Sequence, residues 1–353
     1  AFDRFKRQAI LDRNHKVIAA PLGMGRNFLR LPSVSGRSSF VYSIVACSNL
    51  PKRRSIVLSF GHIMTENMTL EQLSANKCFE GEQRVYRHRS DTLKCDMTFG
   101  VFLPPAALEG KPCPVLFFLS GLTCTHENFI QKSGFQQHAA RHNLIVVNPD
   151  TSPRGVEIAG QDDAYDFGSG AGFYVDAKEE PWSKHYKMYS YVTQELVDVV
   201  NANLPVVPGK RGIFGHSMGG HGALICALKN PGLYQSVSAF APIANPTECP
   251  WGKKAFAGYL GSNPDDWALW DATHLVSQYE STPQELFIDQ GAADNFLAGK
   301  QLLPENLLAA ADGNDHIQTI FKQREGYDHS YFYIATFVAE HIAYHAALLT
   351  ASA

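Results

Sequence analysis

Short, wholly apolar runs that alternate with helical segments constrain the fold of this 353-residue chain more than any other feature. The runs "VLFFLS" (115–120), "LIVVNPD" (144–150) and "SVSAFAPI" (236–243) have the length and composition of strands buried on both faces. Amphipathic segments such as "YSYVTQELVDVVNANL" (189–204) lie between them. This alternation predicts an α/β fold class, with a mainly parallel central sheet covered by helices on both faces.

The other elements extend this pattern. Helix-poor insertions at 150–188 and 245–280 are expected to carry substrate loops, because ligands in such sheets bind beyond the carboxyl ends of the strands. We expect an antiparallel strand pair at 83–90 and 94–105, helices at 127–143 and 219–230, strands at 211–217, 285–291 and 317–326, and a last helix that ends near residue 349.

The charge is distributed unevenly along the chain. Residues 1–63 contain eleven Lys and Arg but only two acids, Asp3 and Asp12, whereas the remaining residues contain 20 basic and 32 acidic side chains. We therefore predict a basic, Ser-rich and poorly ordered extension at 1–63, acting as an organellar targeting segment or consisting of upstream sequence, and a single catalytic domain at 69–349. An acidic domain excludes nucleic acid as a partner, and apolar runs shorter than about 18 residues exclude a membrane partner.

Cysteine and histidine spacing gives no sign of a metal centre. The seven cysteines contain no C-x-x-C pair, which favours free thiols in a reducing compartment. His341 and His345 could share one helix face, but they lack a neighbouring glutamate and a third ligand. We expect them on the surface of the last helix, and we expect no metal.

Ser217 is the candidate nucleophile. It occupies the centre of "GHSMG" (215–219), a G-x-S-x-G sequence between a predicted strand and a predicted helix. Glycines on both sides allow the sharp turn that presents the serine hydroxyl above the sheet, at the N-terminus of a helix. The alternative is a small residue in a tight turn.

A serine hydroxyl needs a base and an acid that orients the base. In hydrolases of this architecture the acid and then the histidine follow the serine in the chain. Asp294, in a loop after a predicted strand, is favoured over Asp289, which would fix the turn at the strand end. His329 follows the last strand and is the favoured base.

Several neighbouring residues are assigned structural roles. Asp328 is expected to cap the last helix, and His216 and His221, beside the serine, are expected to support the turn. The oxyanion hole requires two backbone N–H groups, which we assign to Met218 and to Leu122, in the loop "LSGLTCTHENF" (119–129). Ser120 and Gly121 are expected to give that loop its backbone freedom.

Six motifs, in order, resemble the S-formylglutathione hydrolase (esterase D) family. The resemblance covers residues 69–349 and maps the triad and oxyanion donors onto the residues above; the 1–63 extension has no counterpart, and Ala293 departs from the usual polar residue. The motifs are "FFLSGLTCTHENF", "NPDTSPRG", "GHSMGGHGAL", "FAPIANP", "IDQGAADNFL" and "GYDHSYFYIATF".

The resemblance implies an α/β-hydrolase fold and a cytoplasmic homodimer. It implies hydrolysis of S-formylglutathione to glutathione and formate in formaldehyde detoxification, without a cofactor. It also implies substrate-binding roles for Cys124 and Trp182, the alternative for Cys124 being a buried thiol that acts as a small apolar residue. The loop 160–176 either positions the amino group of glutathione or is simply solvated.

Two other functions remain open from the residues alone. A broad-specificity carboxylesterase or acyltransferase would use the same triad. A non-catalytic binding protein of the same fold is the second alternative.

Overall fold

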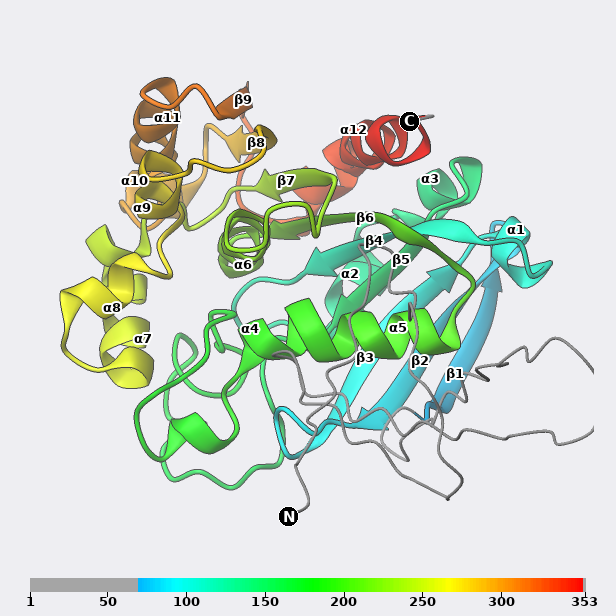
Figure 1. Ribbon diagram of the computed structural model, residues 1–353, viewed down its shortest axis with the longest axis horizontal. Helices are drawn as coiled ribbons and strands as arrows, with labels where there is room; N and C mark the ends of the chain where they lie inside the picture. Colours follow the sequence, from blue (N-terminus) through cyan, green and yellow to red (C-terminus); the bar gives the residue numbers. More distant parts are fainter. Residues whose placement is uncertain (1–68, 352–353) are drawn as a thin grey trace, which may run out of the picture. The chain divides into compact units, whose positions relative to one another are not determined.

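A computed structural model describes residues 69–351, so the predicted extension at 1–63 lies outside the described residues. The described residues form a nine-stranded sheet in the order β1-β2-β3-β5-β4-β6-β7-β8-β9 (Figure 1). The strands are β1 (Glu71–Cys78), β2 (Gly81–Arg89), β3 (Asp96–Leu103), β4 (Cys113–Leu119), β5 (Ile145–Pro149), β6 (Val206–His216), β7 (Ser236–Phe240), β8 (Gln284–Gly291) and β9 (Ile317–Arg324).

The sheet is mainly parallel, as the sequence predicted. Strands β5, β4, β6, β7, β8 and β9 run parallel, and β1, β2 and β3 add an antiparallel extension at one edge. All residues of β5 and β7 are buried, which explains their continuous apolar sequences. Strand β1 was not expected, because its sequence EQLSANKC is polar and exposed, as an edge strand allows.

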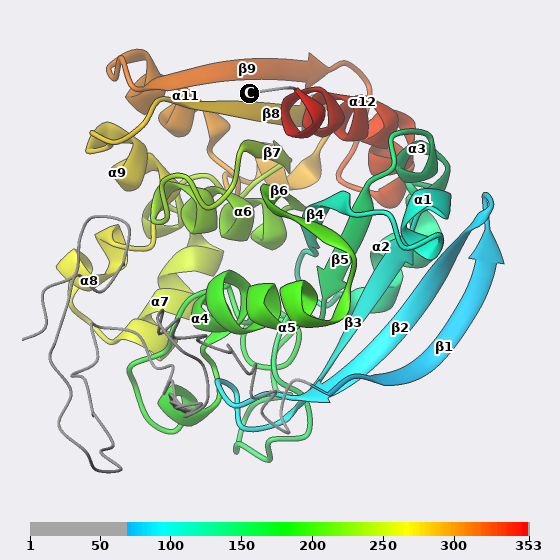
Figure 2. The same ribbon diagram turned by 45° about the vertical axis from the view of Figure 1, so that its right-hand side comes forward.

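Helices cover both faces of the sheet (Figure 2). One face is covered by α2, α3 and α12, of which α12 contacts the other two, and the other face by α5, α6, α9 and α11. The helices are α1 (Pro105–Leu108), α2 (His126–Lys132), α3 (Gln136–Arg141), η2 (Trp182–Lys184), α4 (Met188–Ser190), η3 (Tyr191–Glu195), α5 (Leu196–Asn203), α6 (Met218–Leu228), η4 (Pro246–Glu248), α7 (Pro250–Leu260), α8 (Pro264–Ala268), α9 (Ala272–Ser277), α10 (Asn295–Ala298), α11 (Pro304–Asp312) and α12 (Tyr331–Thr350).

Two helix predictions were wrong. The segment 127–143 forms two helices instead of one, because Gly134 has a left-handed φ of 67° that ends α2. The segment 245–280 is helical rather than helix-poor, since it contains η4, α7, α8 and α9. Pro250 and Pro264 occupy the first helical position of α7 and α8, a start signal that the sequence reading did not use.

His341 and His345 are buried, so their predicted place on the surface of the last helix was wrong. Both rings bind the hydroxyl of Ser238 at 2.8 Å, and His345 also binds the hydroxyl of Ser236 at 2.7 Å. These contacts tie α12 to β7. Among residues 69–351, no group of three or more His, Cys, Asp or Glu side chains could hold a metal ion.

Helix α12 is the one helix among residues 69–351 that is long and apolar enough to cross a membrane by these two criteria alone. It contacts β4, β6 and β7, and its buried residues include Tyr333, Val338 and Ile342. The core helix of a globular domain passes the same test, and the packing of α12 is that of a core helix.

Candidate active site

Ser217 lies in a strained turn between β6 and α6. Its φ of 58° and ψ of −118° are unfavourable for a residue with a side chain, and its N–H donates to the carbonyl of Phe240 at 2.9 Å. A Cβ on Gly215 would lie 2.1 Å from the carbonyl oxygen of Gly219, and one on Gly219 would lie 2.0 Å from that of Leu119. The two glycines are therefore required by close backbone contacts, and the turn has the geometry that the G-x-S-x-G sequence predicted.

The loop after β4 contacts this turn directly. A Cβ on Gly121 would lie 3.1 Å from the Cβ of Ser217 and 3.2 Å from the carbonyl oxygen of His216. Leu122, the predicted oxyanion donor, follows Gly121 and is half-buried, and Met218 is fully buried at the N-terminus of α6. Both predicted donors thus belong to segments that meet at Ser217.

The prediction that Ser120 and Gly121 give this loop its backbone freedom was wrong. Among the loop residues the left-handed backbone conformation occurs at Thr123, with a φ of 66°, rather than at Ser120 or Gly121. The N–H of Thr123 donates to the carbonyl of Gly170 at 2.9 Å, which fixes this conformation. Gly121 is instead required by its close approach to Ser217.

Asp294 is buried and His329 is half-buried, and their side chains form a pair with 2.5 Å between Asp294 Oδ2 and His329 Nδ1. Asp294 ends the turn after β8, and His329 lies between β9 and α12. Backbone hydrogen bonds hold the two loops together, since the N–H groups of Ala292 and Ala293 donate to the carbonyls of Arg324 and Tyr327.

The surroundings of Asp294 favour its carboxylate form. Burial raises the pKa of Asp294, but hydrogen bonds from His329, from the Phe296 N–H and from the Gln290 amide outweigh it, so the net pKa is lowered. Asp294 Oδ1 accepts from the N–H groups of Phe296 and Leu297, and Oδ2 accepts from Gln290 Nε2 at 3.1 Å. A carboxylate held in this way can orient a histidine ring and stabilise its charged form.

The rival acids lie in other environments. Asp289 binds Arg324 at 2.5 Å and the Tyr333 hydroxyl at 2.7 Å, so it joins β8 to β9 and α12 and does not fix the turn as expected. Asp328 accepts from the N–H and the hydroxyl of Ser330. Ser330 itself is the N-cap of α12, so Asp328 supports the cap instead of forming it.

His216 and His221 lie on either side of the serine turn. The His216 ring centroid is 4.4 Å from that of His329, and burial together with the nearby His329 lowers the pKa of His216 well below its ordinary value. Burial also lowers the pKa of His221, to about 4, and a ring nitrogen of His221 lies 3.0 Å from the Phe173 carbonyl. Both rings are neutral at pH 7, as supporting residues should be.

The Ser217 hydroxyl forms no hydrogen bond with any residue between 69 and 351. Hydrogen bonds between a nucleophile and its base are often long before substrate binds. His329 nevertheless reaches the serine turn, through its ring contact with His216.

Cys124 and Trp182 have different surroundings. Cys124 is half-buried within the oxyanion loop, and burial raises the pKa of its thiol, which lies near the Tyr331 hydroxyl. Trp182 is buried in an aromatic cluster with Phe167, Tyr186 and Tyr259. No contact in the structure joins Trp182 to Ser217 or His329 among the described residues.

Two acids of the loop 160–176 bind residues outside the loop. Asp166 pairs with Lys254, and Asp176 accepts from the N–H of Ser190 at 3.0 Å. Asp162 and Asp163 are exposed.

Sequence reasoning missed two residues next to the pair of Asp294 and His329. Gln290 donates to Asp294, and the half-exposed Phe296 places its ring 4.9 Å from the His329 ring and 4.7 Å from Trp251. Both belong to the motif "IDQGAADNFL", so their closeness in sequence to Asp294 was the available signal.

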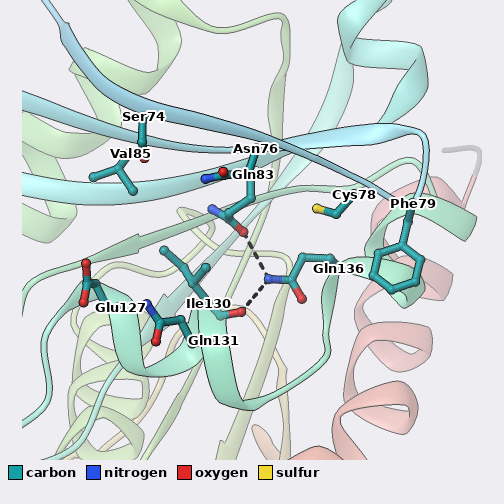
Figure 3. Close-up of a pocket in the computed structure, with 10 residues that line it drawn as sticks. All are labelled: Ser74, Asn76, Cys78, Phe79, Gln83, Val85, Glu127, Ile130, Gln131 and Gln136. Carbon is teal, nitrogen blue, oxygen red and sulfur yellow. Dashed lines mark hydrogen bonds between the residues drawn. The ribbon is translucent and has the colours of Figure 1, made fainter.

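A separate hollow of about 370 Å³ lies between β1, β2 and α2 (Figure 3). Four of the ten residues that line it have amide side chains, and Gln136 Nε2 donates to Gln83 Oε1 and to the Ile130 carbonyl. Cys78 is its one thiol, and burial raises the pKa of that thiol. Among the residues that line it, the hollow contains no pairing of a nucleophile with a base.

Comparisons with known proteins agree with this geometry. A family model described as putative esterase matches residues 90–344. An S-formylglutathione hydrolase from Mus musculus is 59% identical over 284 residues, which cover 80% of this chain and 100% of the mouse protein. One from Bos taurus is 58% identical with the same coverage.

A solved structure is also similar. The S-formylglutathione hydrolase from Agrobacterium tumefaciens is 46% identical, has a TM-score of 0.76, and the match covers 79% of this chain and 99% of that one. The resemblance predicted from the six motifs is thereby confirmed, together with the α/β-hydrolase fold.

Proposed function

The chain belongs to the S-formylglutathione hydrolase family, and from this premise we propose that Ser217, His329 and Asp294 are its catalytic triad. The protein is a serine hydrolase that cleaves the thioester S-formylglutathione to glutathione and formate. The 2.5 Å contact between Asp294 and His329, beside the serine turn, is the observation that carries the triad proposal.

In the first step, Ser217 Oγ attacks the formyl carbon while His329 takes the hydroxyl proton. The carbonyl oxygen becomes an oxyanion, which accepts hydrogen bonds from the backbone N–H groups of Leu122 and Met218. Asp294 holds the imidazole and stabilises its charged form. The C–S bond then breaks, the glutathione sulfur receives the proton from His329, and a formyl-serine remains.

In the second step, water attacks the formyl-serine and gives a proton to His329. The resulting oxyanion accepts hydrogen bonds from the same two backbone N–H groups. When it collapses, the bond between the formyl carbon and Ser217 Oγ breaks, Oγ takes the proton back from His329, and formic acid leaves and ionises to formate in water. The chain supplies every proton acceptor and donor in this sequence, so no metal or cofactor enters it.

The contact of Gly121 with Ser217 supports the oxyanion assignment. Because the two Cβ positions would be only 3.1 Å apart, the loop that carries Leu122 lies against the nucleophile. Losing one oxyanion donor lowers the rate of such enzymes by roughly 10² to 10³.

Substitution of Ser217 by Ala tests the mechanism. We expect turnover of S-formylglutathione to fall below a few per cent, with an unchanged fold by circular dichroism. A fluorophosphonate probe should label the wild-type protein at Ser217 alone. Retained turnover, or labelling elsewhere, would reject the nucleophile.

Cys124 and Trp182 are proposed as substrate-side residues. The position of Cys124 in the oxyanion loop, two residues after Leu122, supports this role, so alkylation of the wild-type enzyme should block turnover and Cys124→Ser should resist this inhibition. The support for Trp182 is its place in the aromatic cluster of the insertion 150–188. Trp182→Ala should raise KM more than it lowers kcat.

A broad-specificity carboxylesterase is the second candidate function. It is favoured by the half-exposed ring of Phe296 beside His329, where the leaving group must receive its proton. Comparing kcat/KM for S-formylglutathione and for a naphthyl ester would decide between a dedicated and a broad enzyme.

We further propose a cytoplasmic homodimer. The six described cysteines are free thiols, which supports a reducing compartment. Light scattering of the purified protein and fractionation of cells test the two parts separately.

A further inference from the structure

Gln290 directly contacts the proposed triad acid, and the mechanism above gives it no task. It is the next-to-last residue of β8 and is almost fully buried. Its Nε2 atom donates to Asp294 Oδ2 at 3.1 Å and to the Gly291 carbonyl at 3.1 Å. Asp294 Oδ2 is the same oxygen that binds His329 Nδ1.

The orientation of this amide follows from chemistry. Both neighbours of Nε2, the carboxylate of Asp294 and the carbonyl of Gly291, are acceptors only. Turning the amide around would place Oε1 against two other oxygens. The donor must therefore face Asp294.

This orientation leaves Oε1 buried without a hydrogen-bond partner among residues 69–351. Such an atom lowers stability, and an apolar side chain of similar size would avoid the loss. Burial of an amide here is thus unfavourable for the fold alone, and both of its hydrogen bonds serve the acid and its turn.

With Gln290 included, each oxygen of the Asp294 carboxylate accepts two hydrogen bonds. Oδ1 accepts from two backbone N–H groups, and Oδ2 accepts from His329 and Gln290. Two donors on one oxygen fix the direction in which that oxygen faces the imidazole. They also share its negative charge, so the Gln290 amide limits how strongly the carboxylate attracts a proton onto the base.

We propose that Gln290 is a positioning residue that holds Asp294 against His329 and tunes the protonation of the base. The proposal depends on the triad proposed above. Gln290 lies outside the triad, and its hydrogen bond to Asp294 would affect the rate of proton transfer without any contact between Gln290 and substrate.

Gln290→Met tests this, because methionine keeps the length of the side chain and removes the donor. We expect kcat for S-formylglutathione to fall about 10- to 100-fold, the usual effect of losing a hydrogen bond to a charged group. KM should stay within about twofold. The acidic limb of the kcat/KM profile should move to higher pH, since an unshared carboxylate charge favours the protonated base.

Gln290→Leu is the second variant, because it removes the donor with a shorter side chain and decides the matter if the methionine variant does not fold. Its acidic limb should move in the same direction as that of Gln290→Met. Gln284→Met is the matched control, because Gln284 lies on the same strand and its amide donates only to the Glu285 carbonyl. Its pH profile should equal that of the wild type.

Three outcomes would overturn the proposal. These are wild-type kcat in Gln290→Met, an unchanged acidic limb in both Gln290 variants, and an equal shift in Gln284→Met. A loss of kcat that is explained by a lower melting temperature, with no shift of the acidic limb, would also overturn the proposal. If Ser217→Ala retained turnover in the same assay, the proposed mechanism itself would fail, which separates the two failures.

Discussion

Asp289 and Asp294 lie on one continuous strand and turn, yet only Asp294 binds His329, while Asp289 binds Arg324 on the neighbouring strand. The separation arises because Asp289 lies within β8, where its side chain meets β9 and α12. Asp294 lies beyond the strand end, where the loop carries it above the sheet. We therefore expect substitution by Asn to have different effects at the two positions, on turnover at Asp294 and on stability at Asp289.

Asp294→Asn should impair turnover and leave stability nearly unchanged. Loss of the triad acid lowers kcat by roughly 10⁴-fold in serine hydrolases, because the histidine loses its orientation and tautomer. Asp289→Asn should instead leave Arg324 without its full partner and lower the free energy of unfolding by about 3–5 kcal/mol. Steady-state kinetics and urea unfolding of both variants check this, and a reversed pattern would exchange the two roles.

Ser217→Gly should raise stability while abolishing turnover. The φ of 58° costs a serine about 1–3 kcal/mol, and glycine adopts this conformation freely. Ser217→Ala, which keeps the strain, is the control. Thermal unfolding should show a higher melting temperature for the glycine variant than for the alanine variant, and equal temperatures would mean that the turn is unstrained.

Gly219→Ala should prevent stable folding. The added Cβ would lie 2.0 Å from the Leu119 carbonyl oxygen, so β4 and the start of α6 could not both keep their places. Gly313→Ala is the control, because the nearest atom to its added Cβ is 3.6 Å away. Soluble yield and circular dichroism should be normal for the control and strongly reduced for Gly219→Ala.

The free energy of unfolding should decrease as the pH falls below about 6.5. Burial lowers the pKa of His341 and, more strongly, that of His345, so both rings stay neutral in the folded protein. The unfolded chain takes up protons below the ordinary histidine pKa of about 6.5, and this favours unfolding by at most about 1.4 kcal/mol per pH unit for each ring. Above about pH 6.5 both rings are neutral in the folded and in the unfolded protein, so they no longer make the free energy of unfolding depend on pH.

His345→Gln tests the contribution of one ring. Glutamine can bind the serine hydroxyls but does not titrate in this range, so stability should depend less on pH between 6.5 and 5. The exposed His274 gives the control variant His274→Gln. Urea unfolding at a series of pH values measures both, and identical slopes in all three proteins would exclude His345 as a source of acid sensitivity.

Local sequence rules determined the fold class and the serine turn. Short apolar runs can be buried on both faces only in a sheet covered by helices, and this predicted the parallel strands β4 to β9. Glycines around Ser217 predicted the turn because the close backbone contacts there admit no Cβ. Both signals act within a few residues, so a single sequence contains them.

Tertiary structure alone decided which distant groups meet. His341 and His345 looked like surface residues, since their partners on β7 are more than 100 positions away in sequence. The sequence already favoured Asp294 over Asp289, but the contact of Asp294 with His329 is visible only in the tertiary structure. The pairing of Gln290 with Asp294 also required coordinates, because an amide has no preferred partner until the chain places a carboxylate within hydrogen-bond distance.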